Sequence, residues 1–311
     1  MTDWTTIGIR FALYANLMLS FGLPFFALYA LRGAERIKSA VLPLRTASTV
    51  LALVGFGLSL LSIVVMTASM TGVPIAEVDR ASINAMIFDT PMGSAWQVRM
   101  GALAVLFSTV LVCGGSQRAW WLAVSTASAG IALGSLAWTG HGAAGEGTQG
   151  TVQLGADVVH LLAAGAWIGA LVALAMLLVK RAGTWTDERL RLVHRVLQGF
   201  SVAGTVIVGS VMVSGLINGW TLVGPDRVLS AFGTPYGQLL CLKLVLFIAM
   251  LRLASINRYR LVPCFEAAIA AGDSAAARAH LRRSVAVETA LAVVILALVA
   301  WLGTLQPPAA M

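Results

Sequence analysis

A carboxylate, an imidazole and an indole lie within one long apolar stretch of the chain, from about Thr151 to Val179. His160 and Trp167 follow Asp157 by three and ten residues. At about 100° per residue, the three side chains project from one face of a helix. A neutral imidazole can ligate copper, zinc or haem iron, and a nearby carboxylate can orient the ring or compensate the charge of a metal. We therefore predict a metal site at His160. The alternative is a histidine that only hydrogen-bonds a neighbouring helix.

Further candidate ligands are expected at the same end of the membrane. His141 closes the sequence Trp138-Thr-Gly-His, and Met66 and Met70 are spaced i, i+4. Thioether sulfur is a soft ligand that suits Cu(I). We interpret His141, Met66 and Met70 as secondary ligands. The alternatives are a solvent-exposed loop histidine and methionines that fill gaps in apolar packing.

Two cations lie at matching places in the apolar runs. Arg99 and Lys243 each stand nine residues after the threonine of a Thr-Pro-x-Gly sequence, at Thr90 and Thr234. Threonine is a good helix N-cap and proline suits the first helical position, so both sequences predict helix starts. Nine residues of helix span about 13 Å, which places both cations near the middle of a bilayer. The repeated spacing predicts two parallel halves of four helices each.

A charge at that depth is costly unless it is paired or hydrated. One interpretation of Arg99 and Lys243 is a structural ion pair, with Asp157 or Asp89 as the partner. The other is a site for an anionic group, such as a haem propionate, a quinone or a lipid head group. Glu288 is expected to pair with Arg252 or Arg258.

Composition places these residues in a polytopic membrane protein. The chain has 311 residues, of which 59% are hydrophobic and 11% charged, and its mean hydropathy is +0.87. The net charge is +8, but basic residues gather in alternate loops and no basic patch is interleaved with aromatic residues, so we exclude nucleic-acid binding. No Walker, GxGxxG or CxxC sequence and no arrangement of nucleophile and base is present, so the chain is not expected to be an enzyme.

Eight apolar runs predict an all-α membrane protein, a bundle of about eight transmembrane helices in a single domain, 1–311, with repeat halves 1–150 and 151–311. The expected spans are Ile7–Leu31, Leu44–Met70, Ser94–Cys113, Ala119–Thr139, Val152–Val179, Val196–Asn218, Tyr236–Ile256 and Val285–Leu305. Loops after the odd-numbered spans carry most Lys and Arg, which places them in the cytoplasm and both termini in the periplasm. Pro263–Arg283 is expected to form a cytoplasmic amphipathic helix, and Val73–Thr90 a short helix on the outer side.

The sequence from His160 to Gly169, His-Leu-Leu-Ala-Ala-Gly-Ala-Trp-Ile-Gly, resembles the signature of the copper-resistance protein D (CopD-like) family. Further matches follow in family order: Trp138-Thr139-Gly140-His141, Arg195 with Phe200-Ser201, Gly215, Thr234 with Tyr236-Gly237 and Lys243, Asn257-Arg258, and Arg283 with Glu288. The resemblance implies an inner-membrane protein of about eight spans that takes copper from the periplasm toward the cytoplasm. It also implies a periplasmic copper-binding partner of the CopC type, and it makes His160 the natural ligand.

We therefore predict copper transport or homeostasis, with Cu(I) or Cu(II) taken up from the periplasmic side of a bacterial inner membrane. The predicted His/Met site consists of His160, His141, Met66, Met70 and Asp157, supported by Trp167, Trp138, Arg99 and Lys243. Membrane lipid is the other expected partner. The alternative is a haem-binding membrane oxidoreductase or electron-transfer protein. Haem held by paired histidines would have to use His160 within a span and His141 at its edge.

Overall fold

The structure is a computed structural model that describes residues 4–36, 38, 41–113, 120–139, 147–179, 185–224 and 227–308. Within this part of the chain, eight helical segments are long and apolar enough to cross a membrane, and no strand is present. They are α1 (Trp4–Ala30), α2 (Leu44–Thr71), α4 (Pro91–Cys113), α5 (Trp120–Gly134) continued by η3 (Ser135–Thr139), α6 (Gly147–Leu178), α7 (Asp187–Val223), α9 (Pro235–Ile256) and α11 (Ala275–Leu302). The predicted polytopic all-α bundle is confirmed.

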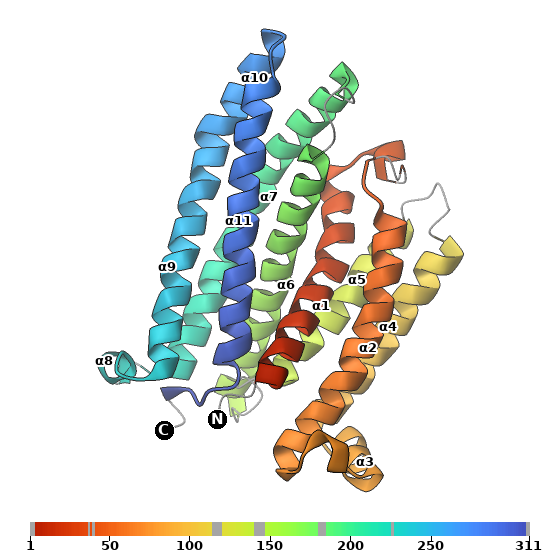
Figure 1. The fold of residues 1–311 in the computed structure, drawn as a ribbon, viewed down its shortest axis with the longest axis vertical. Coiled ribbons are helices and arrows are strands. Elements are labelled where there is room, and N and C mark those ends of the chain that lie inside the picture. Colours follow the sequence, from red (N-terminus) through yellow and green to blue (C-terminus); the bar gives the residue numbers. More distant parts are fainter. Residues whose placement is uncertain are drawn as a thin grey trace.

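The eight segments run roughly alongside one another (Figure 1). The start of α1 and the end of α11 lie at the same end of the bundle, together with the short helices α3 (Arg80–Phe88) and α8 (Val228–Ala231). We call this the α8 end. The opposite end, which carries α10 (Val262–Ala270), is the α10 end.

The two central helices, α1 and α6, pack together through glycines. A methyl group on Gly22 would overlap the backbone of Gly165 and Gly169. Small residues let membrane helices approach closely, and close approach increases the dispersion contacts that hold such helices together. This crossing joins the first four spans to the last four.

Both Thr-Pro-x-Gly sequences begin a helix, as predicted. Thr90 Oγ1 accepts from Gly93 N at 2.9 Å, and Thr234 Oγ1 accepts from Gly237 N at 3.1 Å. Each glycine also lies against the carbonyl end of the preceding short helix, where a methyl group would overlap backbone atoms. The sequence therefore combines a cap, a helix start and a close approach in four residues.

The prediction of an amphipathic helix over Pro263–Arg283 is wrong. Helix α9 continues through a π-helical turn, η6 (Asn257–Leu261), into α10, and the chain reverses at Gly272 (φ 77°) before α11. The wider π turn accommodates Pro263, which lacks the N–H that a regular helix would use. The predicted short helix after span 2 is confirmed as α3, whose N-cap Asp79 accepts from Ser82 N at 2.6 Å.

Helix packing differs between the two sets of four spans. In the first set, α1, α2, α4 and α5 form a closed ring in which each helix packs against its two neighbours. In the second set, α6 packs against α7 and α11, and α11 packs against α9, but α7 and α9 are not a packed pair. The second set is therefore open along one side.

Candidate functional site

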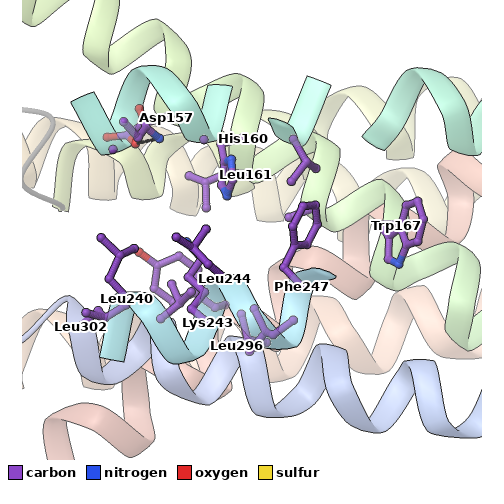
Figure 2. A pocket seen from close by; sticks show the side chains of 18 of the residues that line it. Asp157, His160, Leu161, Trp167, Leu240, Lys243, Leu244, Phe247, Leu296 and Leu302 are labelled. Atoms are coloured by element: carbon purple, nitrogen blue, oxygen red, sulfur yellow. Dashed lines mark hydrogen bonds between the residues drawn. The ribbon is translucent and has the colours of Figure 1, made fainter. Parts of the chain in front are cut away.

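A cavity of about 460 Å³ lies between α6, α7, α9 and α11, and α1 closes it on the side of the first set (Figure 2). Its wall is mostly apolar. Its polar and aromatic lining residues are Arg10, Tyr14, Asp157, His160, Trp167, Asn218, Tyr236, Lys243 and Phe247. Ligand sites in proteins commonly combine such an apolar wall with a few convergent polar groups.

The orientation of His160 is set by α7. Its Nδ1 lies 3.1 Å from Ser214 Oγ, and the Ser214 hydroxyl itself donates to the Ser210 carbonyl at 2.5 Å. The hydroxyl has one proton, and we assign it to this bond because it is shorter than the contacts of Ser214 Oγ to the Val211 carbonyl and to His160 Nδ1. With this assignment, Ser214 accepts from His160 and the imidazole carries its proton on Nδ1. The lone pair on Nε2 is then the one that a metal can use.

Asp157 lies less than one helical turn from His160 on α6 and is also held by α7. Asn218 Nδ2 donates to Asp157 Oδ1 at 2.6 Å. Lys243, on α9, lines the opposite wall (Figure 2). Within the described residues the ion pairs closer than 4.0 Å are Arg195–Glu35 and His194–Glu266, so Lys243 and Asp157 face each other without a salt bridge.

Trp167 stands farther along α6, toward the α10 end (Figure 2). Its ring is 5% exposed and packs edge-on against Phe200, with 5.9 Å between the ring centroids. A second cavity of about 280 Å³ lies beyond it and is lined by Trp167, Asn257 and Glu288. Trp167 therefore separates the cavity that holds His160, which we call the outer cavity, from an inner cavity.

Two family models match the chain. The model for the N-terminal domain of copper resistance protein D-like proteins matches residues 1–151, and the model for copper resistance protein D matches residues 194–302. Copper resistance protein D of Pseudomonas syringae pv. tomato is 43% identical over 314 residues, which cover 99% of this chain and 98% of that protein. The chain belongs to the copper-resistance protein D family.

Other relatives of this CopD-family chain carry different names. Copper transport protein CutJ of Bacillus subtilis (strain 168) is 30% identical over 257 residues, which cover 81% of the chain and 46% of that protein. Inner membrane protein YebZ of Escherichia coli (strain K12) is 26% identical over 312 residues, which cover 99% of the chain and 100% of that protein. No solved structure matches. Asp157 and His160 fall between the two family-model matches, and the alignment to the Pseudomonas protein spans nearly the whole chain.

The structure of this CopD-family member brings some of the predicted site residues together. Asp157, His160, Trp167 and Lys243 all line the outer cavity. His141 lies outside the described residues. The predicted residues that the structure places away from the outer cavity are Met66 and Met70 on α2, Arg99 on α4 and Trp138 in η3.

The predicted methionines are separated from His160 by the central helix. Helix α2 packs against α1 and α4, and α1 stands between α2 and α6. Met66 is half-buried and Met70 is 60% exposed. Three other methionines share the cavity wall with His160, namely Met18, Met212 and Met250.

Two predicted ion pairs are not formed in this CopD-family structure. Arg99 is 2% exposed, and its Nε and Nη1 atoms have no hydrogen-bond partner among the described residues. Glu288 is 1% exposed and accepts a hydrogen bond from Asn257 Nδ2 rather than from an arginine, so the predicted arginine pair is wrong. Arg258 instead donates to Thr205 Oγ1 at 2.5 Å.

Several residues of the site were absent from the sequence-based prediction. Ser210, Ser214 and Asn218 follow one another at intervals of four on α7, a polar stripe in an apolar helix that indicates a polar neighbour. Asn218 lines the cavity, and Ser214 contacts the cavity residue His160. Arg10 also lines the cavity, although nothing in the sequence around it indicated a site. Its Cζ atom lies 6.0 Å from the centroid of the Tyr14 ring. Among the described residues, no cluster of three or more His, Cys, Asp and Glu side chains could hold a metal.

Proposed function

We propose that this chain takes copper from the periplasmic side of a bacterial inner membrane toward the cytoplasm, through the outer cavity. His160 is the primary ligand. The observation that carries the proposal is the hydrogen bond from its Nδ1 to Ser214, because it leaves the Nε2 lone pair for a metal. The names of the relatives supply the metal, since the Pseudomonas protein is a copper resistance protein and CutJ is a copper transport protein.

The ligand chemistry of the cavity suits Cu(I). Thioethers and imidazoles are ligands that this soft ion accepts, and Met18 and Met250 line the same cavity as His160. Asp157 provides the negative charge that a cation needs in an apolar wall. Met66, Met70 and His141 remain predicted secondary ligands at an earlier stage of uptake, at the periplasmic end.

The route toward the cytoplasm passes Trp167. Beyond the ring lies the inner cavity, where the carboxylate of Glu288 offers the next negative group. The distribution of basic residues among the loops supports an orientation in which the α8 end and both termini face the periplasm. A periplasmic copper-binding protein of the CopC type would deliver the metal at that end.

Metal content and uptake test this proposal together. His160→Ala is compared with His194→Ala, a histidine of α7 outside the outer cavity that pairs with Glu266. We expect His160→Ala to abolish copper bound to the purified protein and to lower copper accumulation in cells given limiting copper, at matched membrane levels. His194→Ala should behave as wild type. Unchanged bound copper and uptake in His160→Ala would reject the site.

Haem is the second candidate. Within the described residues, His160 is the one histidine of the outer cavity, and the described side chains that could supply a second haem ligand there include the thioethers of Met18 and Met250. The visible spectrum of the purified protein separates the two functions. A Soret band that disappears in His160→Ala would replace copper with haem.

A further inference from the structure

The second set of helices is open between α7 and α9, whereas the corresponding pair in the first set, α2 and α4, is closed. Helices α4 and α9 both begin at a Thr-Pro-x-Gly sequence, and each follows the second helix of its set, α2 or α7. In the first set, α2 packs against α4, and Trp96 Nε1 donates across the pair to the Ser59 carbonyl at 2.8 Å. In the second set, α7 and α9 are not packed, and the outer cavity lies behind the gap.

The gap faces lipid. Four cavity-lining side chains on its two edges are large, apolar and exposed: Met212 (48%) and Leu216 (72%) on α7, and Leu244 (50%) and Ile248 (65%) on α9. Exposed apolar side chains in the middle of a spanning helix contact the hydrocarbon of the bilayer. A lipid-soluble molecule can therefore reach the cavity sideways, between α7 and α9.

Polar groups lie on two facing walls of this cavity. Asp157 and His160 stand on one side and Lys243 on the other, with Leu240 and Phe247 on the α9 side (Figure 2). Asp157 and the Nε2 atom of His160 accept hydrogen bonds, whereas the Lys243 ammonium donates them. Asp157 and His160 thus offer acceptors on the α6 side, and Lys243 offers a donor on the α9 side. The lining also holds four other polar side chains, those of Arg10, Tyr14, Asn218 and Tyr236.

We propose that the outer cavity binds a membrane quinol. Such a molecule has a compact flat ring, an oxygen at each of two opposite edges and a single isoprenoid tail. One quinol hydroxyl donates to His160 or Asp157, the opposite oxygen accepts from Lys243, and the tail leaves between α7 and α9. Because the acceptor wall needs a hydroxyl donor, the reduced quinol binds more tightly than the oxidised quinone.

Size and depth favour this ligand over a phospholipid. A cavity of about 460 Å³ lies in the range of small-molecule sites. Lys243 stands eight residues into α9, about 12 Å from the start of that helix, whereas phospholipid phosphates remain at the surface of the hydrocarbon core. The inference goes beyond copper transport and does not require copper, so it is tested on metal-free protein.

The test is equilibrium binding of a short-chain ubiquinol to the purified full-length protein, treated with a chelator and held in neutral detergent. Leu216→Trp fills the gap, and Leu61→Trp is its control on lipid-exposed α2. Lys243→Met removes the donor. We expect saturable binding to wild type and Leu61→Trp. Binding should fall about tenfold in Leu216→Trp, and about tenfold in Lys243→Met through the loss of a charged hydrogen bond.

Several outcomes would overturn the inference. The first is the absence of saturable binding to wild type, and the second is equal binding to wild type and Leu216→Trp. The third is tighter binding of the quinone than of the quinol. The fourth is displacement of the quinol by phosphatidylglycerol, which would make the cavity a lipid site. Thermal unfolding of each variant identifies loss of binding that comes from loss of fold. Copper bound by Leu216→Trp is measured in parallel, because intact copper binding with lost quinol binding separates this inference from the proposed transport.

Discussion

Ser214 Oγ lies 3.1 Å from His160 Nδ1 and 2.5 Å from the Ser210 carbonyl, and together these contacts assign the ring proton to Nδ1 and leave Nε2 free. We predict that Ser214→Ala weakens Cu(I) binding by about tenfold, because loss of a partner that orients a metal-ligating histidine typically costs about 10- to 100-fold in affinity. Competition with a Cu(I) chelator measures the change. Ser62→Ala is the control, since Ser62 makes a similar hydroxyl-to-carbonyl bond at 2.8 Å on α2. Equal affinity in both variants would show that Ser214 does not position the ligand.

Lys243 lines the outer cavity together with His160. Its ammonium group repels a copper ion bound at His160. Lys243→Met should therefore tighten copper binding, by about tenfold if the repulsion is on the order of 1–2 kcal/mol at the effective dielectric of a protein. The same substitution weakens the proposed quinol, so the two ligands respond in opposite directions. Lys38→Met, on the exposed surface at the α10 end, is the control. A lower copper affinity in Lys243→Met would contradict the charge argument.

The number of spans could be predicted from the sequence because a run of about 20 apolar residues has few alternatives to a membrane helix. The starts of α4 and α9 were also predictable, since a Thr-Pro pair encodes both a cap and a first turn. The α6 part of the site followed from helical spacing alone, which places Asp157, His160 and Trp167 on one face.

The remainder depended on packing between distant segments. Arg10 reaches the cavity because α1 crosses α6. The methionines that line the cavity with His160 come from three different helices, α1, α7 and α9. Helical spacing within one span cannot show which helices are neighbours. The gap between α7 and α9 is likewise invisible in sequence, because the same large apolar side chains line the cavity and face lipid, as Met212, Leu216 and Ile248 do.

The crossing of α1 and α6 is expected to tolerate no added methyl group. Gly22→Ala would place a carbon atom inside the backbone of Gly165 and Gly169, and overpacking of this kind typically costs about 1–3 kcal/mol. The midpoint of thermal unfolding in detergent should fall by several degrees. Gly57→Ala is the control, because nothing lies within 4 Å of a methyl group at that position of α2. An equal Tm in the two variants would show that the helices can separate without loss of stability.

The proposed orientation is tested with reporters that are active only in the cytoplasm. A fusion after the last residue should be silent, because the few basic residues at the α8 end favour a periplasmic location for it. The same reporter inserted at Gly272, between α10 and α11, should be active. The opposite pattern would reverse the membrane orientation and with it the proposed direction of copper movement.

On the proposed route, Glu288 is the carboxylate that copper would meet after Trp167, so a variant of Glu288 tests the route separately from the binding site. It is 1% exposed, lines the inner cavity and accepts from Asn257. Glu288→Gln keeps the size and the hydrogen bonding of the side chain but removes its charge. We therefore expect the amount of copper bound at His160 to be unchanged while copper uptake by cells falls about tenfold. A tenfold lower rate corresponds to a loss of about 1.4 kcal/mol of stabilisation in the rate-limiting step. Glu266→Gln is the matched control, because its side chain is 61% exposed and pairs with His194 outside both cavities. Wild-type uptake in Glu288→Gln would mean that copper leaves the outer cavity by another route.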